Sequence, residues 1–358
     1  MRILIIGTGN VATAMAADLT LKGNEVIMLK TTKNIGMEHY KEIKTKGIVF
    51  KDGKKQDEIK IKNVVCDYEE AFKLKPEITV VAVQTNYHEE IIKKIAKFMN
   101  KNHIVMFTPG YLSTAYVLKY CKENTPIVVE TESSVIDCRI TNPGEITVLF
   151  KNVRNPIGVF PKEKASETLE KLKNWQYNYI LTNSVIEAAL HNPNLIVHTI
   201  GAIMSIPRIE YSKGEYWMYK EVFTPSIWNL VEKLDSEKMS ILNKMNLNAI
   251  PYVEACKIRN SIDLSIDAKK VFFDYANKSS PKGPNVSNSR YITEDVPQGL
   301  VLLESLGKVL NIATPTCSAL IVLAGTCLNI DFRKEGRTVE RLGKENIDKI
   351  FQNHWIII

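Results

Sequence analysis

The first 110 residues alternate short, mostly apolar runs with segments in which apolar residues recur every three or four positions. The runs are too short for helices and predict buried strands at 1–6, 25–29, 77–83 and 103–107. The longer periodic segments predict helices at 11–22 and 89–100. Strands that alternate with helices in this order predict an α/β domain built on a mainly parallel sheet.

The first strand runs directly into a turn with G-x-G-x-x-A spacing: Gly7, Thr8, Gly9, Asn10, Val11 and Ala12. Two glycines allow a tight turn and a close backbone approach to a pyrophosphate, and Ala12 stands where the helix must pass near the strand. Because a strand precedes this turn and a helix and a second strand follow it, we interpret it as a dinucleotide-binding turn. The N-terminal part is therefore predicted to be a doubly wound parallel sheet of the Rossmann type.

Two later loops are expected near the same cofactor. Ligands of open α/β sheets bind beyond the carboxyl ends of the strands, and two further strands end just before polar or turn-forming residues. These residues are Gln84 and Thr85 after one strand, and Pro109 and Gly110 after the next. The alternative is that they are ordinary turn residues.

The end of the second strand bears on the choice of cofactor. NAD-binding units usually carry Asp or Glu there to accept the ribose hydroxyls, whereas this strand ends in Lys30, Thr31, Thr32 and Lys33. Cations and hydroxyls bind a 2′-phosphate that a carboxylate would repel. We therefore expect NADP(H) to be preferred, with NAD(H) possible; the alternative is that both lysines are only solvated and that either cofactor is used.

Beyond about residue 183, helical periodicity dominates. It is clear at 224–245, 251–258 and 299–310, whereas 278–289 is rich in Ser, Pro, Asn and Gly and predicts a loop. Together with short extended runs between 127 and 160, this pattern predicts two domains. They are a dinucleotide-binding domain at 1–182 and a mainly α-helical substrate domain at 183–358.

Composition narrows the class of protein. The chain has 47 Lys and Arg against 40 Asp and Glu, a net charge of +7, without a basic block interleaved with aromatics that would indicate nucleic acid. Its six cysteines lack CxxC or other metal-like spacing and predict reduced thiols, no metal and a cytoplasmic location. An N-terminal strand in place of a signal sequence, and no apolar run of eighteen residues, predict neither secretion nor membrane insertion.

Two segments of the second half carry candidate chemistry. His191 and His198 are seven residues apart and would share a helix face if Pro193 only starts or kinks the helix. Arg290 and Asp295 lie before a helix expected to start at Pro297. An aspartate there can orient an imidazole for proton transfer, and an arginine can clamp a carboxylate. The alternatives are a buried histidine satisfied by the backbone, helix capping by Asp295 and surface pairing by Arg290.

Several shorter motifs accompany the glycine turn and these two segments: Pro109-Gly110, Glu130-Thr131 with Arg139, Asn192 to His198, Tyr219 to Ser226, and Leu234-Asp235. Jointly they resemble the opine dehydrogenase family, and the resemblance spans nearly the whole chain. Octopine-type and nopaline-type members reductively condense a 2-oxo acid with an amino acid.

The resemblance implies site residues. A His and Asp pair is the family's proton-transfer unit, which maps onto His198 and Asp295, and the arginine that binds substrate carboxylate maps onto Arg290. His198 is chosen because the family pattern has an asparagine six positions earlier, which Asn192 matches, and His191 remains the second candidate. The non-acidic Lys30-Thr31 departs from the NAD-using members.

The expected reaction joins pyruvate or a similar 2-oxo acid to an amino acid in the cleft between the domains. Two alternatives stay open: a simple 2-oxo acid reductase similar to ketopantoate reductase, and a non-catalytic NADP(H) sensor. The sensor would not need to bring His198, Asp295 and Arg290 together. The apolar tail 355–358 could pack on its own domain or on a second subunit, which allows a homodimer.

Overall fold

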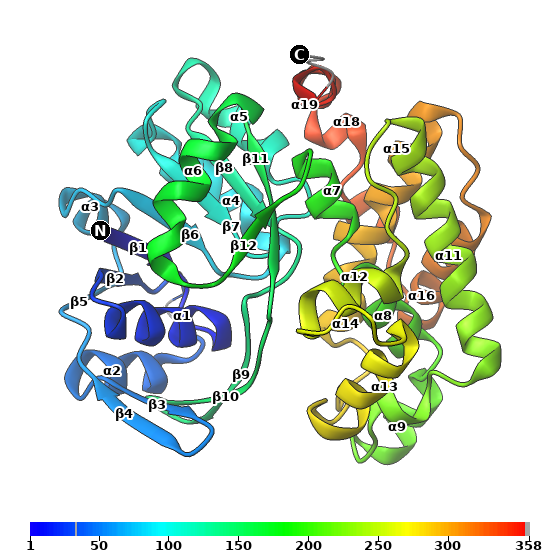
Figure 1. Cartoon of the computed structure of the whole chain (residues 1–358), viewed down its shortest axis with the longest axis horizontal. Coiled ribbons are helices and arrows are strands. Elements are labelled where there is room, and N and C mark those ends of the chain that lie inside the picture. Colours follow the sequence, from blue (N-terminus) through cyan, green and yellow to red (C-terminus); the bar gives the residue numbers. More distant parts are fainter. Residues whose placement is uncertain (33, 355–358) are drawn as a thin grey trace. The chain divides into compact units, whose positions relative to one another are not determined.

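The computed structural model describes residues 1–32 and 34–354 and divides the chain into two compact units (Figure 1). Unit 1 comprises Met1–Val185, and unit 2 begins at Ile186. The expectations for Lys33 and for the tail 355–358 lie outside the described residues.

Unit 1 is built on a sheet in which, among the described residues, eight strands have the order β12-β11-β8-β7-β6-β1-β2-β5. The strands are β1 (Arg2–Ile6), β2 (Glu25–Leu29), β5 (Asn63–Val65), β6 (Ile78–Val81), β7 (Ile104–Phe107), β8 (Ile127–Thr131), β11 (Asn155–Phe160) and β12 (Tyr179–Leu181). All neighbouring pairs are parallel except β11 with β8. The predicted α/β domain with a mostly parallel sheet is confirmed.

The helices of unit 1 are α1 (Asn10–Leu21), α2 (Met37–Thr45), α3 (Tyr68–Lys73), α4 (His88–Ile95), α5 (Thr114–Cys121) and α6 (Ala165–Leu172). Single 3₁₀ turns extend or connect them: η1 (Thr85–Tyr87), η2 (Ala96–Phe98), η3 (Lys122–Asn124), η4 (Lys162–Lys164) and η5 (Lys173–Trp175). The first helix is buried from Ala12 to Leu19, because it packs along the strands beside it. Burial on nearly all sides explains why this helix is rich in alanine.

A second sheet of unit 1 has the order β4-β3-β10-β9. Its strands are β3 (Ile48–Asp52), β4 (Lys55–Ile59), β9 (Ile136–Asn142) and β10 (Glu145–Lys151), and Figure 1 shows β9 and β10 as two long strands that lead to β3 and β4. Extended structure at 145–150 was expected, but a separate sheet was not. The strand β4 exposes four of its five residues, so the sequence lacks the apolar alternation that marks a half-buried strand.

Unit 2 is helical throughout its described regular elements, which confirms the predicted helical second domain. Its helices are α7 (Val185–Leu190, beginning at the unit boundary), α8 (Asn194–Ile203), α9 (Ile206–Ser212), α10 (Met218–Glu221), α11 (Pro225–Lys244), α12 (Tyr252–Asn260), α13 (Ala268–Lys278), α14 (Arg290–Thr293), α15 (Val301–Leu310), α16 (Pro315–Leu328), α17 (Phe332–Glu335), α18 (Val339–Leu342) and α19 (Lys344–His354). The expected loop lies between α13 and α14.

A π-helical turn, η6 (Val296–Leu300), precedes α15 without a break. The helix expected from Pro297 therefore begins in a wider turn than a regular α-helix. Single π-helical turns occur mostly inside α-helices and often at functional sites, because they redirect the side chains around them.

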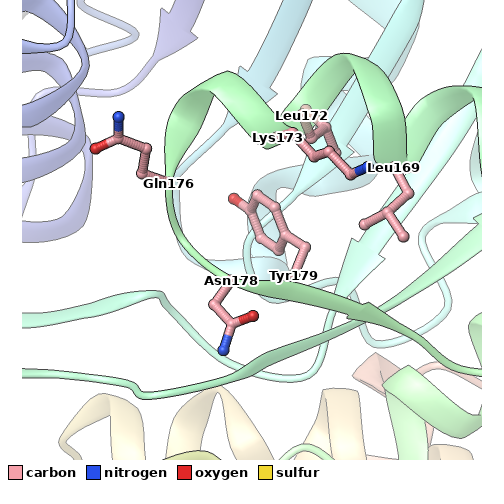
Figure 2. A pocket seen from close by; sticks show the side chains of 6 residues that line it. All are labelled: Leu169, Leu172, Lys173, Gln176, Asn178 and Tyr179. Carbon is pink, nitrogen blue, oxygen red and sulfur yellow. The ribbon is translucent and has the colours of Figure 1, made fainter.

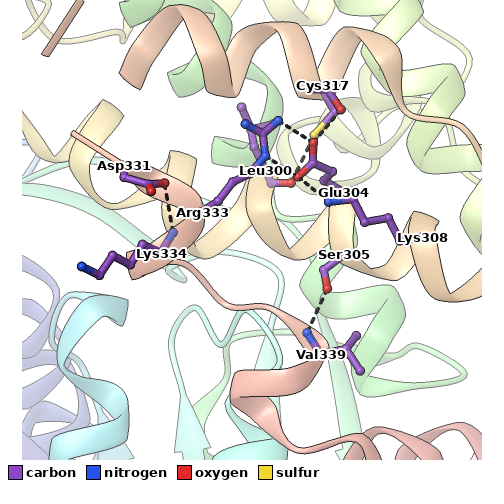
Figure 3. Close-up of polar contacts among 10 residues, drawn as sticks. Leu300, Glu304, Ser305, Lys308, Cys317, Asp331, Arg333, Lys334 and Val339 are labelled. Carbon is purple, nitrogen blue, oxygen red and sulfur yellow. Dashed lines mark hydrogen bonds and ion pairs between the residues drawn. The ribbon is translucent and has the colours of Figure 1, made fainter. Parts of the chain in front are cut away.

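One buried carboxylate ties α15 to α16 and α17, as Figure 3 shows. Glu304 accepts hydrogen bonds from Arg333 Nε and Nη2 at 2.8 and 2.7 Å and from Ser318 Oγ at 2.6 Å. The Arg333 guanidinium, acting against the cost of burial, lowers the pKa of Glu304 to about 2. The Cys317 thiol of α16 donates to the Leu300 carbonyl at 3.1 Å, so α16 also contacts the last residue of η6.

The described part of the chain contains no single helix that is long and apolar enough to cross a membrane. One sharply bent pair, α16 with the segment Phe332–Leu342, reaches the required length and apolar composition together.

Candidate active site

The residues expected to bind the cofactor gather at one edge of the main sheet. The strands β2, β1, β6 and β7 are parallel neighbours, so their carboxyl ends lie side by side. These strands are followed by Lys30, Gly7, Gln84 and the Thr108-Pro109 bond, respectively. The arrangement expected from the sequence, with four loops at the switch-point edge, is present in unit 1.

The glycine turn fits a bound pyrophosphate. Gly7 has φ +124°, and a Cβ there would lie 2.6 Å from the Ala82 carbonyl oxygen, so only glycine is accommodated. A Cβ at Gly9 would meet no other described atom within 4 Å, and no described side chain caps the N-terminus of α1 that follows. Open space in front of uncapped backbone N–H groups suits an anion.

Three other residues of the turn have distinct environments. Ala12 is fully buried, as its place at the closest approach of helix and strand requires, while Thr8 and Val11 are partly exposed. The Asn10 side chain accepts a hydrogen bond from the Ile140 backbone N–H at 2.8 Å, so it holds β9 against the start of α1. That structural contact was not foreseen for Asn10.

Lys30 is 6% exposed, and its ammonium group donates to Thr32 Oγ1 at 2.7 Å and to the Ile35 carbonyl at 2.6 Å. Burial lowers the pKa of Lys30. The neighbouring His39 accepts from the Gly144 N–H at Nδ1 (2.9 Å), so its Nε2–H donates to Thr13 Oγ1 at 3.0 Å. Burial and the charge of Lys30 lower the pKa of His39, which leaves Lys30 as the positive charge of this corner.

The loop after β7 is fixed by a buried carboxylate. Glu130, fully buried on β8, accepts from the Leu112 N–H at 2.8 Å and from the N–H and hydroxyl of Thr114 at 2.7 and 2.6 Å. A Cβ at Gly110 would lie 1.9 Å from Glu130 Oε2, so the carboxylate occupies the space of any larger side chain. Packing therefore requires glycine at position 110, and the hydrogen bonds to Glu130 fix the backbone of the loop after Pro109.

The loop after β6 carries Gln84 and Thr85 in different settings. Gln84 is exposed, whereas Thr85 is buried at the start of η1. Nearby, His88 contacts Ser113 Oγ at 2.7 Å and the Val83 carbonyl at 3.2 Å. This histidine links the loops after β6 and β7 to each other.

A surface pocket of unit 1 contains none of the predicted residues. Figure 2 shows its lining, which comes from α6, η5, the segment that connects η5 to β12, and the start of β12: Leu169, Leu172, Lys173, Gln176, Asn178 and Tyr179. No group of three or more His, Cys, Asp or Glu side chains in the described ranges is placed to hold a metal ion.

In unit 2, His198 and Asp295 meet although 97 residues separate them. The His198 Nδ1 and Asp295 Oδ2 atoms are 2.8 Å apart, and the two side chains are 7% and 1% exposed. A carboxylate can only accept, so Nδ1 carries a hydrogen, and whenever the ring is neutral Nε2 is its proton-accepting edge. No described residue forms a hydrogen bond with Nε2.

Tyr291 lies flat against the His198 ring, a contact that the sequence did not reveal. The ring centroids are 3.8 Å apart and the planes differ by 4°. Tyr291 lies in α14, four positions before Asp295, and the backbone stays helical through Glu294 and Asp295. Residues four apart share a helix face, so one short segment supplies both contacts to His198. The spacing was a usable signal, but an aromatic residue there is equally typical of core packing.

Arg290 has a different setting from the buried pair. Its side chain is 46% exposed, and Nη1 lies 3.4 Å from Oε2 of the buried Glu294. A long, loosely held ion pair leaves guanidinium N–H groups for another acceptor. The geometry therefore suits binding of an anionic ligand at the edge of α14.

His191 does not share the environment of His198. His191 lies in the turn after α7, which ends at Leu190, whereas His198 lies in α8, so the two histidines do not share a helix face. The Ile250 N–H donates to His191 Nε2 at 3.3 Å, and burial together with Lys238 and Arg259 strongly lowers the pKa of His191. The ring is a neutral acceptor within the core of unit 2.

Both parts of the chain are similar to known proteins. Residues 181–328 match the family model of the α-helical domain of NAD/NADP octopine/nopaline dehydrogenases, and residues 3–156 match the model of ketopantoate reductase PanE/ApbA. Opine dehydrogenase from Arthrobacter sp. (strain 1C) is 29% identical over 95% of this chain and 94% of its own length.

Two solved structures share the fold. Octopine dehydrogenase, solved with NADH and L-arginine, has a TM-score of 0.76 at 16% identity and covers 98% of both chains. Yersinopine dehydrogenase with bound NADP⁺ has a TM-score of 0.71 at 13% identity and covers 99% of this chain and 97% of its own. Likeness over nearly the full length, together with the match of the helical domain, makes the chain similar to the opine dehydrogenases, which are NAD(P)-dependent oxidoreductases.

Proposed function

We propose that this protein uses NAD(P)H to condense a 2-oxo acid, pyruvate or a close analogue, with the amino group of an amino acid. The observation that carries the proposal is the buried contact between His198 and Asp295. Loss of water between ketone and amine gives an imine. Addition of a hydride to its carbon and a proton to its nitrogen gives a secondary amine with two carboxylates.

His198 and Asp295 are proposed to manage the protons. Asp295 holds the Nδ1–H, so the Nε2 edge can take a proton from the amine or return one to the departing hydroxyl group. The same carboxylate stabilises the imidazolium that forms meanwhile, because both side chains are shielded from water. A sensor that only bound nucleotide would not require this buried pair.

Arg290 is proposed to bind a substrate carboxylate. A guanidinium offers parallel N–H groups that match the two oxygens of a carboxylate, and Arg290 is exposed enough to reach a ligand. It lies on the same short helix as Tyr291, which stacks on His198. A carboxylate bound there would therefore be fixed relative to the histidine.

The nucleotide cofactor is proposed to bind at the glycine turn, where Gly7, Gly9 and the uncapped start of α1 leave room for a pyrophosphate. When bound, the nicotinamide supplies the hydride. Gln84, Thr85, Pro109 and Gly110 border the same sheet edge and are proposed to line the rest of the site. The chain's own contribution is to bind and orient the cofactor.

NADP(H) is proposed as the preferred form. Lys30 places a buried positive charge at the end of β2, beside the start of α2, and no described side chain caps that helix. The loop residues that hold the ammonium group also keep it from swinging away. A 2′-phosphate would meet this charge directly, with Thr31 next to it in the chain.

A simple 2-oxo acid reductase is the second candidate, because residues 3–156 match the ketopantoate reductase model. Oxidation of NADPH and of NADH with pyruvate, measured with and without single amino acids, separates the two. Oxidation that requires both pyruvate and one particular amino acid supports the proposal. Oxidation that needs no amine would establish the simple reductase, and cofactor binding without any oxidation across the panel would count against both.

A further inference from the structure

We infer that Tyr291 is a positioning residue that sets the plane of the His198 ring and thereby the direction of its Nε2 edge. The inference rests on the proposed proton-transfer role of His198. It concerns how that histidine is held, and no substrate contact is assigned to Tyr291.

The stacking geometry is tighter than packing alone requires. Aromatic pairs commonly lie with ring centroids 4.5 to 7 Å apart, whereas His198 and Tyr291 are 3.8 Å apart and within 4° of parallel. Other aromatic neighbours in the described part of unit 2 have centroids between 5.1 and 6.3 Å apart. The imidazole therefore has a flat wall on one face.

The hydrogen bond to Asp295 does not suffice to fix the ring. The second side-chain torsion of histidine is broad, so a single bond at Nδ1 lets the ring tilt about that contact. Tilting moves Nε2, which lies on the far side of the ring from Nδ1. A parallel aromatic wall opposes the tilt without using a hydrogen-bonding group, and leaves Nε2 available.

One short segment carries both restraints. Tyr291 and Asp295 are four residues apart on one helix face, and both approach α8 at His198. The π-helical turn η6 begins immediately after Asp295. The segment from Tyr291 to Asp295 thus holds His198 in two ways: Asp295 accepts from the Nδ1 atom, and Tyr291 packs against one face of the ring.

The test compares Y291F, which keeps the ring, with Y291L, which removes it. Expected results are a kcat within about twofold of wild type for Y291F and a kcat lower by about 10- to 100-fold for Y291L. The NADPH Kd should be unchanged in both. Y252L is the matched control, because Tyr252 is a buried tyrosine of unit 2 with an aromatic neighbour at 6.3 Å. It should lower thermal stability and leave kcat unchanged.

A double variant decides whether Tyr291 acts through His198. H198A should remove most turnover, and H198A/Y291L should be no slower than H198A alone. Y291L with wild-type kcat, Y291F as slow as Y291L, or a double variant slower than H198A would each overturn the inference. Near wild-type turnover by H198A would instead refute the proposed function. If Y291L does not fold, as judged by circular dichroism, Y291M replaces it with the same expected loss.

Discussion

Replacing Asp295 by asparagine tests the charge of the buried pair while nearly preserving its shape. Asp295 Oδ2 is 2.8 Å from His198 Nδ1, and the two side chains are almost fully shielded. An amide oxygen can still accept the hydrogen bond, so the main loss is the attraction between carboxylate and imidazolium. With charge centres about 4 Å apart and an effective dielectric constant of about 20, that attraction is worth about 4 kcal/mol.

A loss of this size in the stabilisation of the protonated histidine corresponds to a kcat lower by about 10³-fold. The assay is NADPH oxidation at saturating oxo acid and amino acid, with cofactor Kd and thermal midpoint measured on the same sample. D267N is the matched control: Asp267 caps α13 through Lys270 N–H in the same unit, and asparagine caps a helix about as well as aspartate, so kcat should be unchanged and stability should fall by at most about 0.5 kcal/mol. A folded D295N enzyme with wild-type kcat would refute the electrostatic reasoning.

Four further changes have defined outcomes. K30D should weaken NADPH binding by at least about tenfold more than NADH binding, because it reverses the charge expected to face a 2′-phosphate. Fluorescence titration with both cofactors measures the two affinities, and equal weakening of both would contradict the prediction. G110A should destabilise unit 1 by about 1 to 3 kcal/mol in urea unfolding, since its Cβ would meet Glu130. G9A, whose Cβ meets open space, should keep stability and lose cofactor affinity, and the reverse pattern would exclude the glycine turn as the pyrophosphate site. The pKa of Glu304 is lowered from 4.5 to about 2. Its carboxylate therefore adds about 3 kcal/mol to the free energy of unfolding above pH 4.5, and this contribution is lost as pH falls toward 2. E304Q should flatten that part of the curve of unfolding free energy against pH.

Local signals made the first part of the fold predictable. The apolar run before Gly7, the helix after it and the strand at 25–29 are contiguous, so their pairing needs no distant information. The sheet formed by β3, β4, β9 and β10 could not be predicted in the same way. Its two local pairs, β3 with β4 and β9 with β10, are joined only where β10 pairs with β3 across 96 positions, and β4 is mostly polar, so neither periodicity nor proximity predicts the sheet.

In the candidate site, too, residues close together in sequence were predictable and contacts between distant residues were not. The glycine turn was found from local spacing, but the residues alone left the pairing of His198 with Asp295, 97 positions apart, as one of several interpretations, and the resemblance to a family selected it. The stacking of Tyr291 was not expected at all. A tyrosine beside an arginine and two carboxylates carries no sign of which ring it will face, because that depends on how two helices are packed.

The contact between Asn10 and Ile140 limits how the cofactor-binding part could be moved into another protein. It joins residues 130 positions apart, and the path from Thr13 through His39 to Gly144 makes a second tie nearby. A graft that ended after β7 would include every glycine of the turn and yet lack both ties to α1. A portable module must therefore extend through β10, to Lys151, so that the turn arrives with the strands that hold it.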